Sequence, residues 1–136
     1  MTAAGCSVLV VEDEDTVRRL LVQVLTDAGF ATDEAATAGA ALELASLADI
    51  VLTDLALGAE SGLELIATLR RRFPRVPVIA MSGNPSLLAD ATHAGAIFVL
   101  AKPFELDQLR VATTLALVAV TIAGEPGTRS AARCSG

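Results

Sequence analysis

The hydrophobic residues of the chain follow two alternating patterns. Short consecutive runs rich in valine, isoleucine and leucine are typical of strands buried on both faces of a sheet, and one more polar run is typical of a sheet edge. These runs predict strands at residues 7–11, 30–35, 50–54, 78–81 and 97–101. Between them, apolar residues recur three and four positions apart, which is the spacing of one buried helix face. The predicted helices span about 15–28, 38–47, 63–72, 85–94 and 105–123.

Residues at the element ends support this division. Side chains suited to capping stand at three of the helix starts, namely Asp15 or Thr16, Thr37 and Asn84. Pro85 fits the first helical position after Asn84, and Gly95 is expected to end that helix. Residues 55–61 are expected to form a loop.

Five repeats of strand and helix with short joints predict an α/β fold. The expected architecture is a doubly wound, five-stranded parallel sheet with strand order 2-1-3-4-5 and helices on both faces. A chain of 136 residues fits one such domain, placed here at residues 1–123. The remaining residues, 124–136, are rich in glycine, serine, alanine and arginine and are expected to be a disordered tail.

Composition narrows the functional classes. With 53% hydrophobic and 19% charged residues the chain is globular, and no apolar run is long enough to span a bilayer. The net charge of −6 and the lack of tryptophan and tyrosine argue against direct nucleic-acid binding. The N-terminus carries no signal peptide pattern, so a cytoplasmic location is expected. The two cysteines show no metal or redox spacing.

Charged and hydroxyl side chains gather at the ends of four predicted strands. Glu12 and Asp13 follow the first strand, Asp54 ends the third, Ser82 follows the fourth, and Lys102 follows the fifth. In an open parallel sheet these carboxyl ends meet at one edge, where ligands bind. Converging carboxylates favour a hard cation, Mg²⁺ or Mn²⁺. With a lysine and a hydroxyl beside it, Asp54 is predicted to be a nucleophile in phosphoryl transfer.

Each residue also has a structural explanation. Glu14 and Asp15 are best explained as an acidic helix start favoured by the dipole. Asp54 could make only local hydrogen bonds, and Ser82 and Lys102 are weak signals when taken singly. The combination is more specific than any member. A magnesium-dependent phosphotransferase or hydrolase with an aspartyl nucleophile is a second hypothesis, although a later acidic pair and a cap domain are not visible.

Together these motifs resemble the receiver domain of two-component response regulators, a flavodoxin-like fold. The resemblance covers about residues 8–120 and depends on five segments, at residues 10–14, 52–55, 62–65, 81–83 and 102–104. It implies a phosphorylation-controlled switch in a phosphorelay rather than an enzyme that acts on other substrates. A degenerate receiver that is never phosphorylated is a third hypothesis, disfavoured by the intact set of site residues.

The resemblance also implies roles for individual residues. Asp54 would accept a phosphoryl group from a histidine kinase or phosphotransfer protein. Asp13, Asp54 and the backbone carbonyl of Ala56 would bind Mg²⁺ directly, with Glu12 acting through water. Ser82 and Lys102 would contact the phosphoryl oxygens, and the bond between Lys102 and Pro103 would be cis.

Four positions depart from the family pattern or vary within it. Val99 stands where the family usually has a tyrosine or phenylalanine, and Phe98, one position away, is expected to face the other side of the sheet. Gly58 replaces a common proline, which is expected to loosen its loop. Ala56 and Asn84 occupy positions that tune dephosphorylation, and Ala56 cannot hydrogen-bond an attacking water.

The last predicted helix carries two apolar faces. One face consists of Leu106, Leu109, Thr113, Ala116, Leu117 and Val120. The other is expected to form an interface and consists of Val111, Leu115, Val118 and Ile122. A deeply buried helix end is the alternative explanation.

The sequence says less about how the phosphorylated domain would pass on its signal than about the phosphorylation site. The expected interface would join a homodimer or dock a partner on the fourth helix, the fifth strand and the fifth helix. The chain is expected to be a single-domain regulator, and a receiver excised from a hybrid histidine kinase or another multidomain regulator is the alternative.

Overall fold

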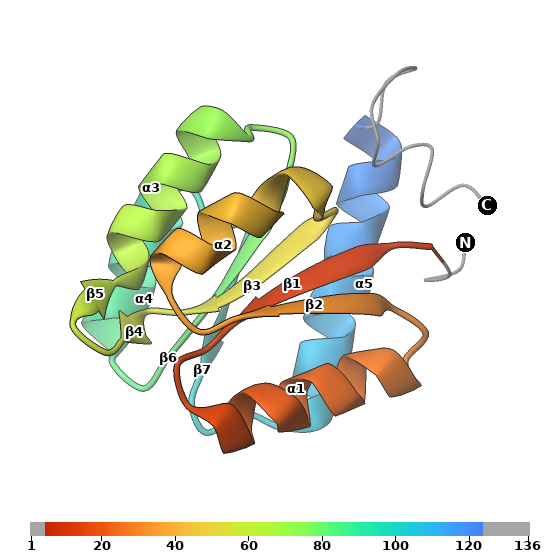
Figure 1. The fold of residues 1–136 in the computed structure, drawn as a ribbon, viewed down its shortest axis with the longest axis horizontal. Coiled ribbons are helices and arrows are strands. Elements are labelled where there is room, and N and C mark those ends of the chain that lie inside the picture. The colour runs from red at the N-terminus through yellow and green to blue at the C-terminus, as the bar shows by residue number, and fades with distance from the viewer. Residues whose placement is uncertain (1–4, 124–136) are drawn as a thin grey trace.

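The computed structural model describes residues 5–123, and its centre is one five-stranded parallel sheet (Figure 1). The strands lie in the order β2-β1-β3-β6-β7. Their bounds are Ser7–Val11 (β1), Ala31–Ala35 (β2), Ile50–Asp54 (β3), Val78–Ser82 (β6) and Phe98–Ala101 (β7). Counted among the long strands alone, this is the predicted order 2-1-3-4-5, so the predicted fold is confirmed. The tail predicted at residues 124–136 lies outside the described residues.

Helices cover both faces of the sheet. Their bounds are Asp15–Asp27 (α1), Ala38–Leu44 (α2), Gly62–Arg72 (α3), Pro85–Ala94 (α4) and Leu106–Ala123 (α5), and a short 3₁₀ turn, Ala45–Leu47, follows α2. Helices α1 and α5 lie on one face and α2, α3 and α4 on the other (Figure 1), and each face has its own apolar core. Across residues 5–123, every helix is too short or too polar to cross a bilayer.

Burial follows from position in the sheet. Every residue of β1, β3 and β6 is buried, because these strands have a neighbour on each side and helices on both faces. The edge strands β2 and β7 mix buried and exposed positions. The polar sequence of β2 was therefore a correct sign of a sheet edge.

Most of the predicted helix ends are confirmed. The Thr37 side chain accepts a hydrogen bond from the Ala40 amide at 3.1 Å, and Asn84 accepts bonds from the first turn of α4. Gly95 ends α4 with a φ of 116°, a left-handed conformation that glycine adopts without strain. The predicted cap of α1 was wrong. Glu14 occupies that position without a side-chain bond, and the Asp15 carboxylate pairs with Arg18 instead.

The segment predicted as a loop after β3 contains a small hairpin. Ala56–Leu57 (β4) pairs antiparallel with Glu60–Ser61 (β5) across a two-residue turn. Gly58 begins this turn with a φ of 64°. The carboxylate of Glu60 then accepts a bond from the Ala38 amide at 3.0 Å, which ties the hairpin to the start of α2. The prediction missed these strands because two-residue strands leave no periodic pattern.

Gly62, the first residue of α3, lies against the backbone that carries Asp54. Its amide donates a hydrogen bond to the Leu55 carbonyl at 3.0 Å. A Cβ atom at this position would lie 2.4 Å from the Asp54 carbonyl oxygen and 2.5 Å from the Leu55 Cα. Both contacts are with backbone, which cannot rotate away. A side chain here would therefore displace either α3 or the end of β3.

We expect Gly62→Ala to lower the free energy of unfolding by about 1–3 kcal/mol, the usual cost of forcing atoms into a packed site. The measurement is urea denaturation followed by circular dichroism. Gly39→Ala is the matched control, because nothing lies within 4 Å of the Cβ atom that alanine would add there, and alanine favours helix. Equal stability of the two variants would contradict the close approach at Gly62.

Candidate functional site

Three charged side chains meet at the carboxyl edge of the sheet. The Lys102 ammonium donates a hydrogen bond to Asp54 Oδ2 and lies 3.5 Å from Glu12 Oε1. Lys102 is the only lysine in the chain. Its position follows from β7, which ends at Ala101 beside Ser82 and delivers the next residue to this edge. A compact cation therefore sits between two carboxylates that come from different strands.

The Asp54 carboxylate is fixed at both oxygens. While Oδ2 faces Lys102, Oδ1 accepts a hydrogen bond from the Ala56 amide at 2.9 Å. The residue is only 6% exposed, at the end of a strand whose other residues are all buried. The Thr53 hydroxyl donates to the Asp54 carbonyl at 2.8 Å, and the Leu55 amide donates to Met81 in β6. These bonds hold the carboxylate in one orientation without removing it from the surface completely.

Glu12 carries the clearest electrostatic signal of the site. Its side chain is almost fully buried, and burial, followed by the neighbouring carboxylates of Asp54 and Asp13, raises its pKa to about 7. Burial lowers the pKa of the Lys102 ammonium, but its contacts with Asp54 and Glu12 outweigh this and raise it above its usual value. The site thus concentrates negative charge beyond what one lysine neutralises.

Asp13 lies at the exposed rim of the site. Its Oδ2 is 3.7 Å from the point where a Cβ would stand on Gly58, so the turn of the β4–β5 hairpin faces it. The carboxylate is close enough to Glu12 to contribute to its raised pKa. The carboxylates of Asp54 and Asp13 therefore both lie near Glu12 at this edge of the sheet.

The donor set fits a hard divalent cation held mainly by oxygen ligands. Within residues 5–123, no three histidine, cysteine, aspartate or glutamate side chains are arranged as a metal-binding group. The predicted direct ligands are two carboxylates, Asp13 and Asp54, and one backbone carbonyl, that of Ala56. Mg²⁺ typically takes one or two carboxylates and keeps several waters. Burial, followed by the neighbouring carboxylates of Asp54 and Asp13, raises the pKa of Glu12, and a cation would offset the repulsion among these carboxylates.

Ser82 and Asn84 are linked to each other. Ser82 ends β6, one residue beyond Met81, which is paired with Asp54. Its oxygen accepts a hydrogen bond from the Asn84 amide at 3.0 Å, so the serine proton is available to another acceptor. The side-chain oxygen of Asn84 accepts bonds from the Ser86 and Leu87 amides. Asn84 therefore serves as a helix cap in addition to any role in tuning dephosphorylation.

Val99, at the predicted aromatic position, and its neighbour Phe98 differ in burial. Phe98 packs against the core on the α1–α5 face, whereas Val99 is 37% exposed. The side chain at position 99 is small and aliphatic, and no aromatic ring replaces it from the neighbouring position. The peptide bond between Lys102 and Pro103 is cis, as the resemblance implied.

Arg18 is a part of the site that sequence reasoning missed. Its guanidinium donates to the Glu12 carbonyl at 2.9 Å and pairs with Asp15 at 2.6 Å and Glu34 at 3.0 Å. It thus fastens the acidic loop after β1 to the end of β2. The Asp15–Arg18 spacing of three on a helix was the only available signal, and it does not indicate Glu34.

Comparison with known proteins identifies the family. The family profile described as "Response regulator receiver domain" matches residues 8–114. The chain therefore belongs to the response regulator receiver domains, the domains through which two-component systems receive their signal from histidine kinases.

Individual relatives agree with this assignment. The chain is 34% identical to the alginate biosynthesis transcriptional regulatory protein AlgB of Pseudomonas aeruginosa over 109 residues, covering 77% of this chain and 24% of that protein. It is 34% identical to the regulatory protein AtoC of Escherichia coli, covering 86% and 26%. The crystal structure of the receiver domain of NtrX from Brucella abortus matches with a TM-score of 0.77 at 32% identity, covering 82% and 98%. The chain spans about a quarter of the length of these curated relatives.

The conformation of Gly58 leads to a prediction about the hairpin beside Asp13. Proline is common here in the family, but proline requires a φ near −65°, and Gly58 has a φ of 64°. We expect Gly58→Pro to lower the free energy of unfolding by about 1–3 kcal/mol. Thermal unfolding would measure the loss. Gly58→Asn is the control, because asparagine tolerates positive φ, and a proline variant as stable as the asparagine variant would refute the prediction.

Proposed function

We propose that this domain is a phosphorylation-controlled switch in which Asp54 accepts a phosphoryl group from a phosphohistidine of a histidine kinase or phosphotransfer protein. The observation that carries the proposal is the Asp54 carboxylate held between Lys102 and the Ala56 amide, with Glu12 and Asp13 beside it. The domain would act in the cytoplasm as a signalling component rather than as an enzyme for a separate substrate.

The proposed step is a transfer between two covalent carriers. An Asp54 oxygen attacks phosphorus, the bond between phosphorus and the imidazole nitrogen breaks, and the freed imidazole takes up a proton. The product is an acyl phosphate on Asp54. Lys102 would move from the carboxylate to a phosphoryl oxygen, and the Ser82 hydroxyl would donate to another.

A divalent cation completes the proposed site. Mg²⁺ or Mn²⁺ would be held by Asp13, Asp54 and the Ala56 carbonyl, with Glu12 acting through water. When bound, it supplies positive charge that neutralises the phosphoryl oxygens during transfer. The chain itself orients the Asp54 carboxylate and excludes part of the water around it.

Incubation with a small phosphodonor such as acetyl phosphate should add one phosphoryl group to the protein in the presence of Mg²⁺. The measurement is intact-protein mass spectrometry. We expect labelling to disappear in Asp54→Asn and on chelation of the metal, and to fall by about 10²-fold or more in Lys102→Ala, the scale of losing one charge-stabilising donor.

Arg75→Ala is the matched control, because Arg75 lies at the other end of the sheet and should label like the wild type. Labelling that persists in Asp54→Asn would place the acceptor elsewhere. Turnover of many phosphate esters would instead favour a phosphatase.

The lifetime of the phosphorylated form should depend on Ala56. This residue is exposed beside Asp54 and has no group that can orient an attacking water. We expect Ala56→Asn to shorten the half-life of the acyl phosphate, measured by loss of the phosphoryl mass over time. Ala59→Asn, an exposed position in the same hairpin, is the control. Identical lifetimes of wild type and Ala56→Asn would contradict this role.

A hollow on the β7–α5 side is the proposed surface for reading the switch. It has a volume of about 370 Å³ and is lined mainly by apolar side chains, among them Val99, Val111 and Leu115. Val111 is 57% and Leu115 47% exposed, and Ile122 is exposed further along α5. Val118 is only half-buried. Leu106, a member of the other apolar face of this helix, is also partly exposed, because it stands at the start of α5. Exposed apolar surface of this kind commonly marks an interface.

We propose that this surface forms a homodimer, with docking of another partner as the alternative. Sedimentation should show dimers in the wild type, with or without a phosphorylating donor, and monomers in Val111→Glu and Leu115→Glu. Leu20→Glu is the control, because Leu20 is equally exposed on α1. A wild type that stays monomeric at high concentration in both states would rule out the dimer.

A further inference from the structure

A second charged surface lies at the amino edge of the sheet, opposite Asp54. Four of the ten lysine and arginine residues fall within residues 70–75, namely Arg70, Arg71, Arg72 and Arg75. No aspartate or glutamate occurs between residues 65 and 89. In the part of the chain that the structure describes, no carboxylate forms an ion pair with any of the four. We call this group the arginine corner.

The helix dipole explains only part of the arginine corner. Arg70, Arg71 and Arg72 form the last turn of α3, where a positive charge is favourable by about 0.3–1 kcal/mol each. Arg70 has an additional structural use, since it donates to the carbonyls of Pro74 at 2.9 Å and Val76 at 3.4 Å. Arg75 lies beyond the helix and is exposed. Neither the dipole nor a carbonyl bond accounts for Arg75.

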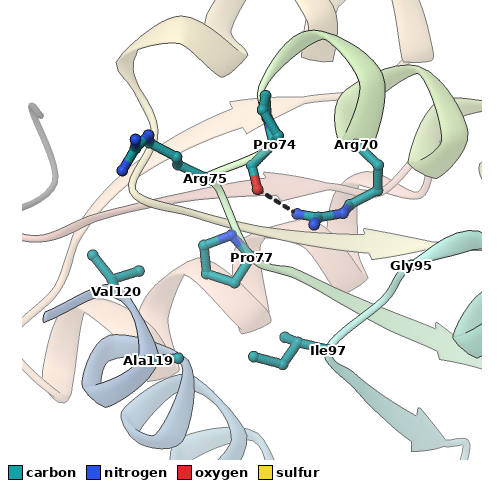
Figure 2. A pocket seen from close by; sticks show the side chains of 8 residues that line it. All are labelled: Arg70, Pro74, Arg75, Pro77, Gly95, Ile97, Ala119 and Val120. Carbon is teal, nitrogen blue, oxygen red and sulfur yellow. Dashed lines mark hydrogen bonds between the residues drawn. The ribbon is translucent and has the colours of Figure 1, made fainter. Parts of the chain in front are cut away.

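A pocket of about 380 Å³ opens between the arginine corner and α5. Figure 2 shows Arg70 and Arg75 on either side of Pro77, with Ile97 and the α5 residues Ala119 and Val120 on the facing wall. Ile97 is 41% exposed although it immediately precedes β7. The pocket therefore combines an apolar wall with two guanidinium groups at its margin, which suits a ligand that is both apolar and anionic.

A second hollow lies next to this pocket. It has a volume of about 230 Å³ and is lined by Arg72, Phe73 and Val76, and it shares Pro74 and Arg75 with the first. The Arg72 guanidinium lies 5.4 Å from the centre of the Phe73 ring, so here too a cation stands over apolar surface. An extended chain can enter both of these neighbouring hollows, which a compact small molecule cannot do.

We propose that the arginine corner and its two hollows bind an acidic peptide segment of a partner protein. Carboxylates of the segment pair with Arg72 and Arg75, and apolar side chains occupy the two hollows. Arginine suits this role because its planar fork pairs with carboxylates in a bidentate geometry. The rest of the domain is strongly acidic, so the corner is the place where an acidic segment can approach without repulsion.

A nucleic acid fits the same surface less well. Phosphate-backbone binding depends on extended basic surface, whereas the domain carries a net charge of −6. The apolar wall formed by Ile97, Ala119 and Val120 has no use in contacts with phosphates. An acidic segment with apolar side chains uses both features.

The test is a selection of phage-displayed random peptides on the unphosphorylated wild-type protein. We expect enriched peptides to be acidic with one or two apolar residues, and to bind in fluorescence anisotropy with an affinity that falls as salt is added.

Arg72→Glu combined with Arg75→Glu should weaken binding by about tenfold or more, because like charges then face each other. Ile97→Glu should weaken it without removing an arginine. Arg19→Glu, an exposed charge change on α1, should leave binding unchanged.

Several outcomes would overturn the proposal. These are no enrichment, enriched peptides without acidic residues, or equal binding by the double variant whose thermal unfolding matches that of the wild type. Binding of a single-stranded oligonucleotide or of phosphatidylglycerol vesicles at these arginines, with no acidic peptide binding, would assign the surface to those partners instead. Peptide binding should also persist in Asp54→Asn, so this proposal stands or falls separately from the phosphoacceptor role.

Discussion

The contact between Lys102 and Asp54 is the interaction on which the rest of the domain depends. Two carboxylates, Glu12 and Asp54, lie nearly buried at the ends of neighbouring strands, and a third, Asp13, adds its charge at the rim. Such a cluster is unfavourable without a cation, and the chain supplies one with Lys102, which follows the edge strand β7. The order β1-β3-β6-β7 is what brings these distant residues together, because every parallel strand ends at the same edge.

Contacts from neighbouring segments fix the backbone and side chains at that edge. Gly62 lets α3 begin directly against the Asp54 carbonyl, and Arg18 ties the acidic loop to β2. The Ala56 amide fixes the second Asp54 oxygen, and the adjoining β4–β5 hairpin is fastened to α2 through Glu60. The contacts that hold the backbone around Asp54 and Glu12 therefore come from α1, from the β4–β5 hairpin and from the start of α3.

The sequence predicted the fold and the meeting of Glu12, Asp54 and Lys102 at one edge of the sheet, for a physical reason. Buried parallel strands appear in the sequence as apolar runs. A charged residue at or just beyond the end of such a run lies at the sheet edge, as Asp13, Asp54 and Lys102 do. The features that were missed depend on contacts between segments. The Arg18–Glu34 pair and the close approach at Gly62 leave no periodic signal, and the hairpin at 56–61 is too short to show one. The cap of α1 was misassigned because Asp15 had a better partner in Arg18.

The presence of one lysine among ten cationic residues has a further consequence for the chemistry of the molecule. All nine other cationic residues are arginines, whose guanidinium groups do not react as amines. Acylation, carbamylation or any other modification aimed at a side-chain amine can therefore reach only Lys102. Any reagent that modifies a side-chain amine of this chain therefore acts at the edge of the sheet that carries Asp54. The rate at which such a reagent modifies Lys102 measures how accessible that edge is to solvent.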